Sequence, residues 1–412
     1  MGRIRKISEQ TLWQILGRVV STVVSIVTLG FITRSLGVSN TGVYTLALAY
    51  LAFFNLLADL GINAHIVPFL LLPKSSLEWR KFLGLRIFLS ILLLAFSVIL
   101  ILFWPGLDPL FKVVVLAGNG LIMTYAIHLT TVAFFQSRLR YDLSALTLIS
   151  SSLFTLMIIY LVLELNLGVL GVMFAQLSGS VVMASLALIL VGRFIKLSPI
   201  FNFSYMAGIF KNSWPLALTM IVNMVYFRLD AFILKFYKSF AEVGVYNVAY
   251  QIFQAALFIP GYIMNSAYPL LISDFNENKN KFLANLKKSM FIMTGLSFVS
   301  TTFAYLLAPF IISVITGNHN FTGSVSALRI LSLSFPAFFL TSILMWVQII
   351  FKKYKTLLLI YLLGFSVNAL ANFIFIPRYS YLAASWITVM SEYLILVVQA
   401  AILIPALRKK DL

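Results

Sequence analysis

Residues 82–104 read FLGLRIFLSILLLAFSVILILFW, and this run contains a single charged residue, Arg86. At ~1.5 Å per residue, a helix of this length crosses the roughly 30 Å hydrocarbon core of a bilayer. Further apolar runs lie near 11–33, 41–71, 113–136, 143–164, 168–191, 214–236, 243–272, 289–316, 324–350, 356–376 and 381–405. The sequence therefore predicts an all-α integral membrane protein with twelve transmembrane helices. The second and eighth runs exceed one straight crossing, and we expect Gly61 and Pro260-Gly261 to break or kink them.

The composition points to lipid as the solvent of this chain. Of the 412 residues, 61% are apolar and 10% are charged, with a mean hydropathy of +1.00, whereas a soluble domain carries roughly 25% charged residues. The net charge of +18 does not indicate a nucleic-acid partner, because the basic residues lie in short gaps between apolar runs, beside lipid headgroups. The chain has no cysteine, and His65, His128 and His319 lie far apart in sequence. Neither a metal site nor a cofactor is expected.

The basic residues predict the orientation of the chain. With the N-terminus inside, the cytoplasmic gaps and their margins hold 22 of the 30 Lys and Arg, Arg86 among them, while the outer gaps hold 5. The remaining 3 lie inside the runs: Arg18, Arg228 and Arg329. This positive-inside bias places both termini in the cytoplasm. The first run has no small-residue cleavage site, so we expect it to be retained as a span.

The chain also repeats itself at an offset of 202 residues. Gly42-Val43-Tyr44 recurs as Gly244-Val245-Tyr246, and Asn63 recurs as Asn265. Because six spans per half give both halves the same orientation, the repeat predicts two six-helix lobes, residues 1–200 and 201–412. Many secondary transporters are built from such lobes and bind their substrate between them.

Several stretches resemble the polysaccharide-unit flippases. Arg34-Ser35-Leu36-Gly37 with Thr41-Gly42-Val43-Tyr44, and then Asp59-Leu60-Gly61, resemble the entry to the second helix of that family and the D-x-G that follows. In the second half, similar segments are Leu229–Leu234 with Glu242–Tyr246, Ile259-Pro260 with Tyr268–Leu271, and Asn372–Pro377. The chain thus resembles Wzx-type O-antigen or exopolysaccharide repeat-unit flippases of the multidrug/oligosaccharidyl-lipid/polysaccharide (MOP) superfamily.

That resemblance implies a fold and a function. The fold would be two MATE/MOP-like six-helix lobes around a central cavity. The function would be translocation of an undecaprenyl-diphosphate-linked oligosaccharide from the inner to the outer leaflet of the bacterial cytoplasmic (inner) membrane by alternating access, without enzymatic chemistry. The implied partners are membrane lipid and other polysaccharide assembly proteins.

Charges inside the bilayer mark either a site or a buried pair, because each costs about 2.5–3.5 kcal/mol on insertion scales. Arg18 and Arg228 are the expected phosphate ligands, since a guanidinium binds phosphate oxygens bidentately; Arg18 could instead reach the inner headgroups. Asp230 lies on another helix face than Arg228 and either joins the substrate site or binds a neighbouring helix. Gln251 and Gln254 either contact sugar hydroxyls or form hydrogen bonds between helices.

Asp59 and Glu392 are the candidate ion-coupling groups, because an intramembrane carboxylate can carry a proton or a cation. The alternative is a buried pair with a basic side chain, which we favour for Asp59. The drive is either an ion gradient or the membrane potential.

Two other functions compete with the flippase. A multidrug or small-molecule exporter of the same superfamily would favour carboxylates over arginines in its cavity. A membrane-embedded glycosyltransferase or polymerase would need acidic residues in sizeable outer loops, and the outer gaps of this chain are short.

Overall fold

The computed structural model describes residues 2–59, 61–70, 75–317 and 320–408, and all regular structure in these ranges is helical. The first half contains α1 (Gly2–Asp59), α2 (Ile62–Leu70), α3 (Ser75–Phe103), α4 (Pro109–Gly118), α5 (Leu121–Ser137), α6 (Tyr141–Glu164) and α7 (Gly168–Gly192). The second contains α8 (Phe203–Tyr237), α9 (Phe240–Ala256), α10 (Phe258–Glu277), α11 (Lys279–Thr316), α12 (Thr322–Ser332), α13 (Phe335–Ile350) and α14 (Tyr354–Arg408). The side chain of Asn265 and the residue His319 lie outside the described part, as does the side chain of His65.

These helices account for the twelve expected spans. Non-helical backbone at Gly37 (φ 70°) divides α1 into the first two spans, and Ser380 (φ 55°) divides α14 into the last two. Glycine adopts a positive φ without strain, whereas Ser380 donates a hydrogen bond from Oγ to Glu242 Oε1 at 2.6 Å. In the described residues seven helical segments, with α4 and α5 counted together as one, are long and apolar enough to cross a membrane, and α12 with α13, bent by 42°, passes the same test as a pair.

Four of the spans are broken, at matching places in the two halves. The second span breaks between α1 and α2, where Gly61 has φ 68°, and the eighth breaks at Leu257 between α9 and α10. Both breaks were expected; Pro260 causes the second, because its ring clashes with the carbonyl four residues earlier, that of Ala256. The fourth and tenth spans also break, between α4 and α5 and between α12 and α13. The sequence interpretation did not foresee these two.

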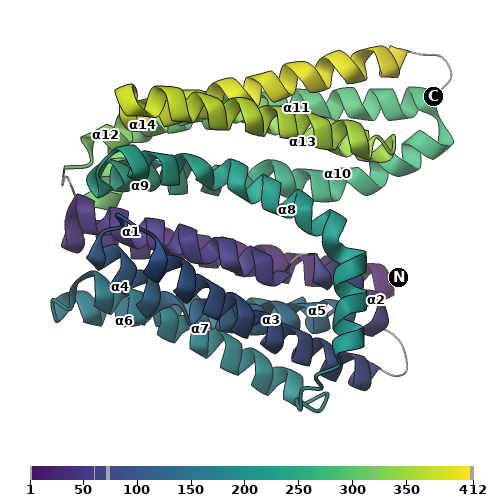
Figure 1. Ribbon diagram of the computed structural model, residues 1–412. Coiled ribbons are helices and arrows are strands. Elements are labelled where there is room, and N and C mark those ends of the chain that lie inside the picture. The colour runs from purple at the N-terminus through teal and green to yellow at the C-terminus, as the bar shows by residue number, and fades with distance from the viewer. Residues whose placement is uncertain (1, 60, 71–74, 318–319, 409–412) are drawn as a thin grey trace. The chain divides into compact units, whose positions relative to one another are not determined.

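Residue contacts divide the chain into two compact units, Met1–Val225 and Tyr226–Leu412. The division falls within α8, later than the expected boundary at residues 200 and 201, because the first turns of α8 pack in unit 1. There Met206 and Ile209 join a buried cluster with Trp79, Phe82 and Phe134. Within each unit most helices lie side by side along a common direction, whereas the first part of α8 runs across those of unit 1 (Figure 1).

The segment that connects the two halves is docked on α3. The amide of Ile200 donates to the carbonyl of Arg80 at 2.9 Å, and Arg80 Nε donates to the carbonyl of Ser198 at 3.0 Å. The backbone of Ile200 approaches Gly84 so closely that a Cβ there would lie 2.2 Å from its carbonyl oxygen. Only glycine permits this approach.

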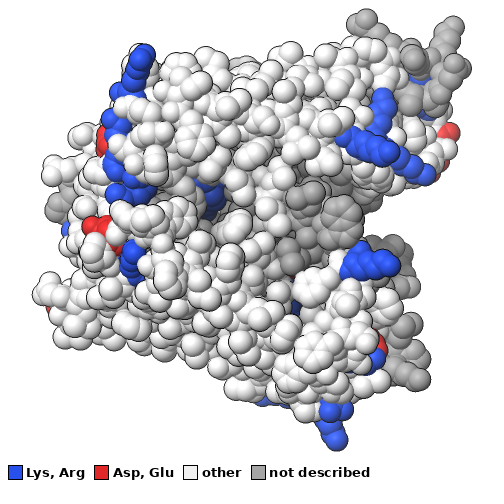
Figure 2. Space-filling view, in the orientation of Figure 1, with Lys and Arg blue, Asp and Glu red and all other residues white. Residues whose placement is uncertain are grey.

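The surface of each unit suits a bilayer. Large apolar side chains are exposed along the spans, such as Phe103 (80% exposed) in unit 1 and Phe291 (81% exposed) in unit 2. On the face drawn in Figure 2, each unit carries most of its Lys and Arg near the ends of its helices, with a broad uncharged band between. These helices therefore form a multi-pass membrane protein.

Candidate functional site

Arg18 lies in the first half of α1 and its side chain is exposed. Its backbone carbonyl accepts a hydrogen bond from Thr22 Oγ1 at 2.8 Å. Tyr125 of α5, itself 39% exposed, interacts electrostatically with both Arg18 and Asp59. The side chain of Arg18 is therefore accessible on unit 1. This exposure agrees with both roles expected for it, a phosphate ligand and a headgroup anchor.

Asp59 forms a salt bridge with Arg86. Arg86 Nη2 lies 3.0 Å from Asp59 Oδ1, and the arginine side chain is fully buried while the aspartate side chain is 17% exposed. Because its side chain is fully buried, Arg86 is not one of the headgroup anchors expected among the basic residues. The same guanidinium donates from Nη1 to the carbonyl of Ala58 and from Nη2 to Asn63 Oδ1 at 2.5 Å. Asp59 thus takes the paired arrangement that we favoured over a free carrier.

Arg228 and Gln254, both predicted for the substrate site, form a hydrogen bond in unit 2. Arg228 Nη2 donates to Gln254 Oε1 at 3.2 Å, and the guanidinium carbon lies 5.8 Å from the ring centroid of Tyr250. Both side chains are half-buried, as is Gln251, one turn before Gln254 on α9. The structure therefore groups a cation, an amide and an aromatic face on α8 and α9.

Asp230 does not join this group. Its side chain is 3% exposed, accepts a hydrogen bond from the hydroxyl of Tyr246, and accepts another from the backbone amide of Ala231 at 2.7 Å. These hydrogen bonds correspond to the second of the two roles expected for Asp230, that of binding a neighbouring helix.

Glu392 is buried in α14 within a network of neutral polar groups. The hydroxyl of Tyr226 donates to Glu392 Oε1 and lies 3.3 Å from Ser391 Oγ. Asn368 Nδ2 donates to Ser391 Oγ at 3.0 Å, and Asn372 Nδ2 donates to Asn368 Oδ1 at 2.9 Å. Among the described residues, the hydrogen-bond partner of this carboxylate is the hydroxyl of Tyr226 on α8, and the amides of α14 bind the neighbouring Ser391 and Asn368.

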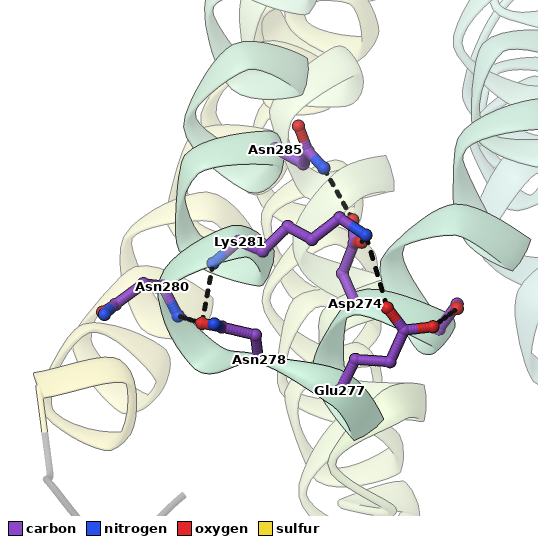
Figure 3. Close-up of polar contacts among 7 residues, drawn as sticks. Asp274, Glu277, Asn278, Asn280, Lys281 and Asn285 are labelled. Atoms are coloured by element: carbon purple, nitrogen blue, oxygen red, sulfur yellow. Dashed lines mark hydrogen bonds and ion pairs between the residues drawn. The ribbon is translucent and has the colours of Figure 1, made fainter.

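A second polar cluster joins the end of α10 to the start of α11 (Figure 3). Lys281 Nζ lies 3.0 Å from Asp274 Oδ1 and 3.3 Å from Glu277 Oε2, and Asn285 Nδ2 donates to Asp274 Oδ2 at 2.6 Å. The amide of Asn285 and then the ammonium of Lys281 hold the pKa of Asp274 below its ordinary value. Asn278 caps α11 through its side-chain oxygen. This cluster fixes a helical corner outside the apolar part of the spans.

The described residues contain no group of three or more His, Cys, Asp or Glu side chains that could hold a metal ion.

The sequence interpretation missed the partners of the intramembrane charges. Arg86 was one, and Tyr226, Tyr246 and Tyr250 were the others. A signal existed for Tyr246, because the repeated Gly-Val-Tyr motif places Tyr44 at the equivalent position. Tyr44 also binds across helices, donating to Gln176 Oε1 at 3.1 Å.

Comparison with known proteins relates the chain to a family and to solved structures. The family described as "Polysaccharide biosynthesis protein" matches residues 7–275. No curated protein sequence matches the chain.

Several solved transporters share the fold. The lipid II flippase MurJ, in an inward closed conformation, superposes with a TM-score of 0.77 at 16% identity, covering 95% of this chain and 87% of that one. An inward-facing multidrug resistance MATE family transporter of the MOP superfamily gives a TM-score of 0.79 at 14% identity, covering 97% and 100%. A MOP superfamily transporter from Pyrococcus furiosus gives 0.63 at 13% identity, covering 98% and 96%. These likenesses show the expected fold of twelve helices in two lobes.

Proposed function

This chain belongs to the polysaccharide biosynthesis protein family and shares its fold with transporters of the MOP superfamily. From this premise we propose that it is a transporter of that superfamily and flips a polyprenyl-diphosphate-linked oligosaccharide. The cargo is an O-antigen or exopolysaccharide repeat unit on undecaprenyl diphosphate. It moves from the inner to the outer leaflet of the bacterial cytoplasmic membrane by alternating access. Both termini are cytoplasmic, and other polysaccharide assembly proteins supply and consume the cargo.

The observation that carries this proposal is the group formed by Arg228, Gln254 and Tyr250. An intramembrane arginine is costly. Its direct contacts are neutral, one amide oxygen and one aromatic face, and the carboxylate of Asp230 acts on it electrostatically without forming an ion pair. A guanidinium has five N–H donors, and the bond to Gln254 uses one. A diphosphate oxygen supplies both the negative charge and the acceptors that such a group needs.

The neighbouring groups suit the remainder of the cargo. Gln254 and Gln251 offer amide donors and acceptors to sugar hydroxyls, and Tyr250 offers a ring face. On unit 1, exposed Arg18 is positioned to receive a diphosphate from a leaflet. Asp230, which binds Tyr246, supports this site from within unit 2.

Transport is coupled to an ion through Glu392. Its carboxylate is 2% exposed, and its hydrogen-bond donor is the neutral hydroxyl of Tyr226. A proton or a monovalent cation would offset its charge. Asp59, already paired with Arg86, is the second candidate.

The test is transport in proteoliposomes that hold a fluorescent polyprenyl-diphosphate oligosaccharide in one leaflet. We expect the wild type to move the lipid, and Arg228→Gln and Arg18→Gln each to slow movement by about tenfold, the effect of losing one charge-assisted contact. Arg329→Gln is the matched control, because Arg329 is held by the carbonyl and ring of Tyr305. Movement of a cationic drug, but not of the lipid, would establish the multidrug alternative instead.

In the native host, deletion of the gene should leave lipid-linked repeat units accumulated on the cytoplasmic side. Normal export of the polysaccharide from the deletion strain would contradict the proposal.

A further inference from the structure

The break between α1 and α2, hereafter the α1–α2 break, is closed by one buried side chain. Arg86 of α3 reaches acceptors on both sides of it: the carbonyl of Ala58 and the carboxylate of Asp59 at the end of α1, and Asn63 Oδ1 at the start of α2. Its side chain has no solvent exposure, so it is not a headgroup anchor. The guanidinium is therefore enclosed between the three acceptors and the ring of Phe82, 5.1 Å from its carbon atom.

The contacts continue from the break into α5. Asn63, whose oxygen accepts from Arg86, donates from Nδ2 to the carbonyl of Leu129 at 3.1 Å. Behind it, Ile62, Ile66 and Leu70 of α2 are buried in the aromatic cluster of unit 1. The position of α2 thus depends on a chain of polar contacts that starts at Arg86.

The equivalent break in unit 2 is made differently. Between α9 and α10 the cause is Pro260, a covalent feature that removes a helical hydrogen bond permanently. The α1–α2 break lies at Gly61, whose positive φ costs glycine little, and the contacts that span it are hydrogen bonds and an ion pair, which can dissociate and form again. A buried ion pair contributes little net stability compared with apolar residues of similar volume, so a fixed kink would not need one.

We propose that Arg86 is a positioning residue for transport: it clamps the α1–α2 break by binding Ala58, Asp59 and Asn63 together, and so holds α2 and Asp59 in the arrangement that the transport cycle uses. The part concerning transport rests on the proposed function, whereas the clamp itself does not.

The absence of cysteine from the chain gives a direct assay. Ile66→Cys places one thiol on α2 at a position with no exposure, and Met264→Cys places one on α10 at an equally buried position. In purified protein, reaction with N-ethylmaleimide then reports how often each helix leaves its packed position. With Arg86 intact, both thiols should react slowly.

Three substitutions separate a clamp from a simple charge pair. Arg86→Met removes every contact. Asp59→Asn with Arg86→Met leaves no uncompensated charge, so the protein should fold with a Tm near that of the wild type. Arg86→Lys keeps a charge opposite Asp59, but its single ammonium nitrogen replaces the planar guanidinium and cannot reach all three acceptors. All three should raise the labelling rate of Ile66→Cys by about tenfold or more, the effect of one lost buried charge-assisted bond, and should leave Met264→Cys unchanged.

The same variants should also slow lipid transport, the double variant included. If Ile66→Cys reacts at the wild-type rate in the Arg86→Lys protein, the contact is an ion pair and not a clamp. If the double variant transports lipid at the full rate, the clamp has no role in transport. Either result overturns the proposal. If the wild-type protein moves no lipid-linked oligosaccharide at all, the proposed function fails. In that case the N-ethylmaleimide labelling of Ile66→Cys still decides whether the clamp exists.

Discussion

Replacing Gly84 with alanine should loosen the segment that connects the two halves of the chain. The new Cβ would lie 2.2 Å from the carbonyl oxygen and 2.6 Å from the carbonyl carbon of Ile200. Both are backbone atoms, so no side-chain rotation relieves the clash. Reaching an ordinary contact requires α3 and the connecting segment to separate by about 1.2 Å.

That separation breaks the two hydrogen bonds that dock the segment. The bonds from the Ile200 amide to the Arg80 carbonyl and from Arg80 Nε to the Ser198 carbonyl, now 2.9 and 3.0 Å, would lengthen to about 4 Å, beyond hydrogen-bonding distance. Each is worth ~1 kcal/mol, and the helix propensity of alanine returns up to ~1 kcal/mol. The net destabilisation of unit 1 is therefore about 1–2 kcal/mol, a fall in Tm of roughly 2–8 °C.

Two measurements check this reasoning. Trypsin cleaves after Arg193 and Lys196, both exposed beside the docked segment, and should cut the Gly84→Ala protein faster than the wild type. A thermal melt in detergent should show the lower Tm. Gly208→Ala is the matched control, because a Cβ at that helical position meets nothing within 4 Å. Equal cleavage rates and equal Tm values for the two variants would refute the docked arrangement.

Three further results are expected. Glu392→Gln should abolish the dependence of lipid transport on the ion gradient, while Tyr226→Phe, which removes the hydroxyl that binds Glu392 and Ser391, should weaken it. Transport is measured with each gradient imposed separately, and unchanged coupling in Glu392→Gln would exclude this carboxylate. Gln254→Leu should lower transport by about tenfold, since it removes a partner of Arg228, whereas Gln348→Leu, on α13, should not. Because the folded state lowers the pKa of Asp274, the stability that this group adds to the corner between α10 and α11 is present above its unfolded pKa of about 3.9 and is lost as pH falls further. After correction for the pH dependence of intrinsic amide exchange, protection at residues 273–285 should fall below pH ~4 and stay constant between pH 7 and 5.

The spans and two of the four breaks were predictable because their causes are local. Apolar runs of sufficient length mark a crossing, and Gly61 and Pro260 act on the helix in which they lie. The fourth and tenth spans break at Asn119-Gly120 and at Leu333. Their apolar runs did not exceed one straight crossing as the second and eighth did, so the hydropathy pattern did not indicate a break. The boundary within α8 depends on which cluster Met206 and Ile209 join, and that is decided by packing.

The partners of the intramembrane charges were not predictable for a related reason. Arg86 lies 27 residues from Asp59 in sequence, and only the packing of α3 against the end of α1 brings them together. From sequence alone, its place near a basic gap indicated a headgroup anchor. Arg228 and Gln254, 26 residues apart, were each predicted for the site, but their contact was not.

The carboxylates inside the two units are compensated in different ways, and this difference assigns them different tasks. In unit 1, Asp59 faces a guanidinium that also binds the backbone, so its charge is already balanced and a proton or cation would have to compete with Arg86. In unit 2, the described residues place no ion pair on Glu392 or Asp230, and each accepts a hydrogen bond from a tyrosine. A hydroxyl donor stabilises a carboxylate without neutralising it, so the membrane cost of the charge remains. Binding of a mobile cation is therefore more favourable at Glu392 than at Asp59, whereas loss of the Asp59 pair acts mainly on the position of α2.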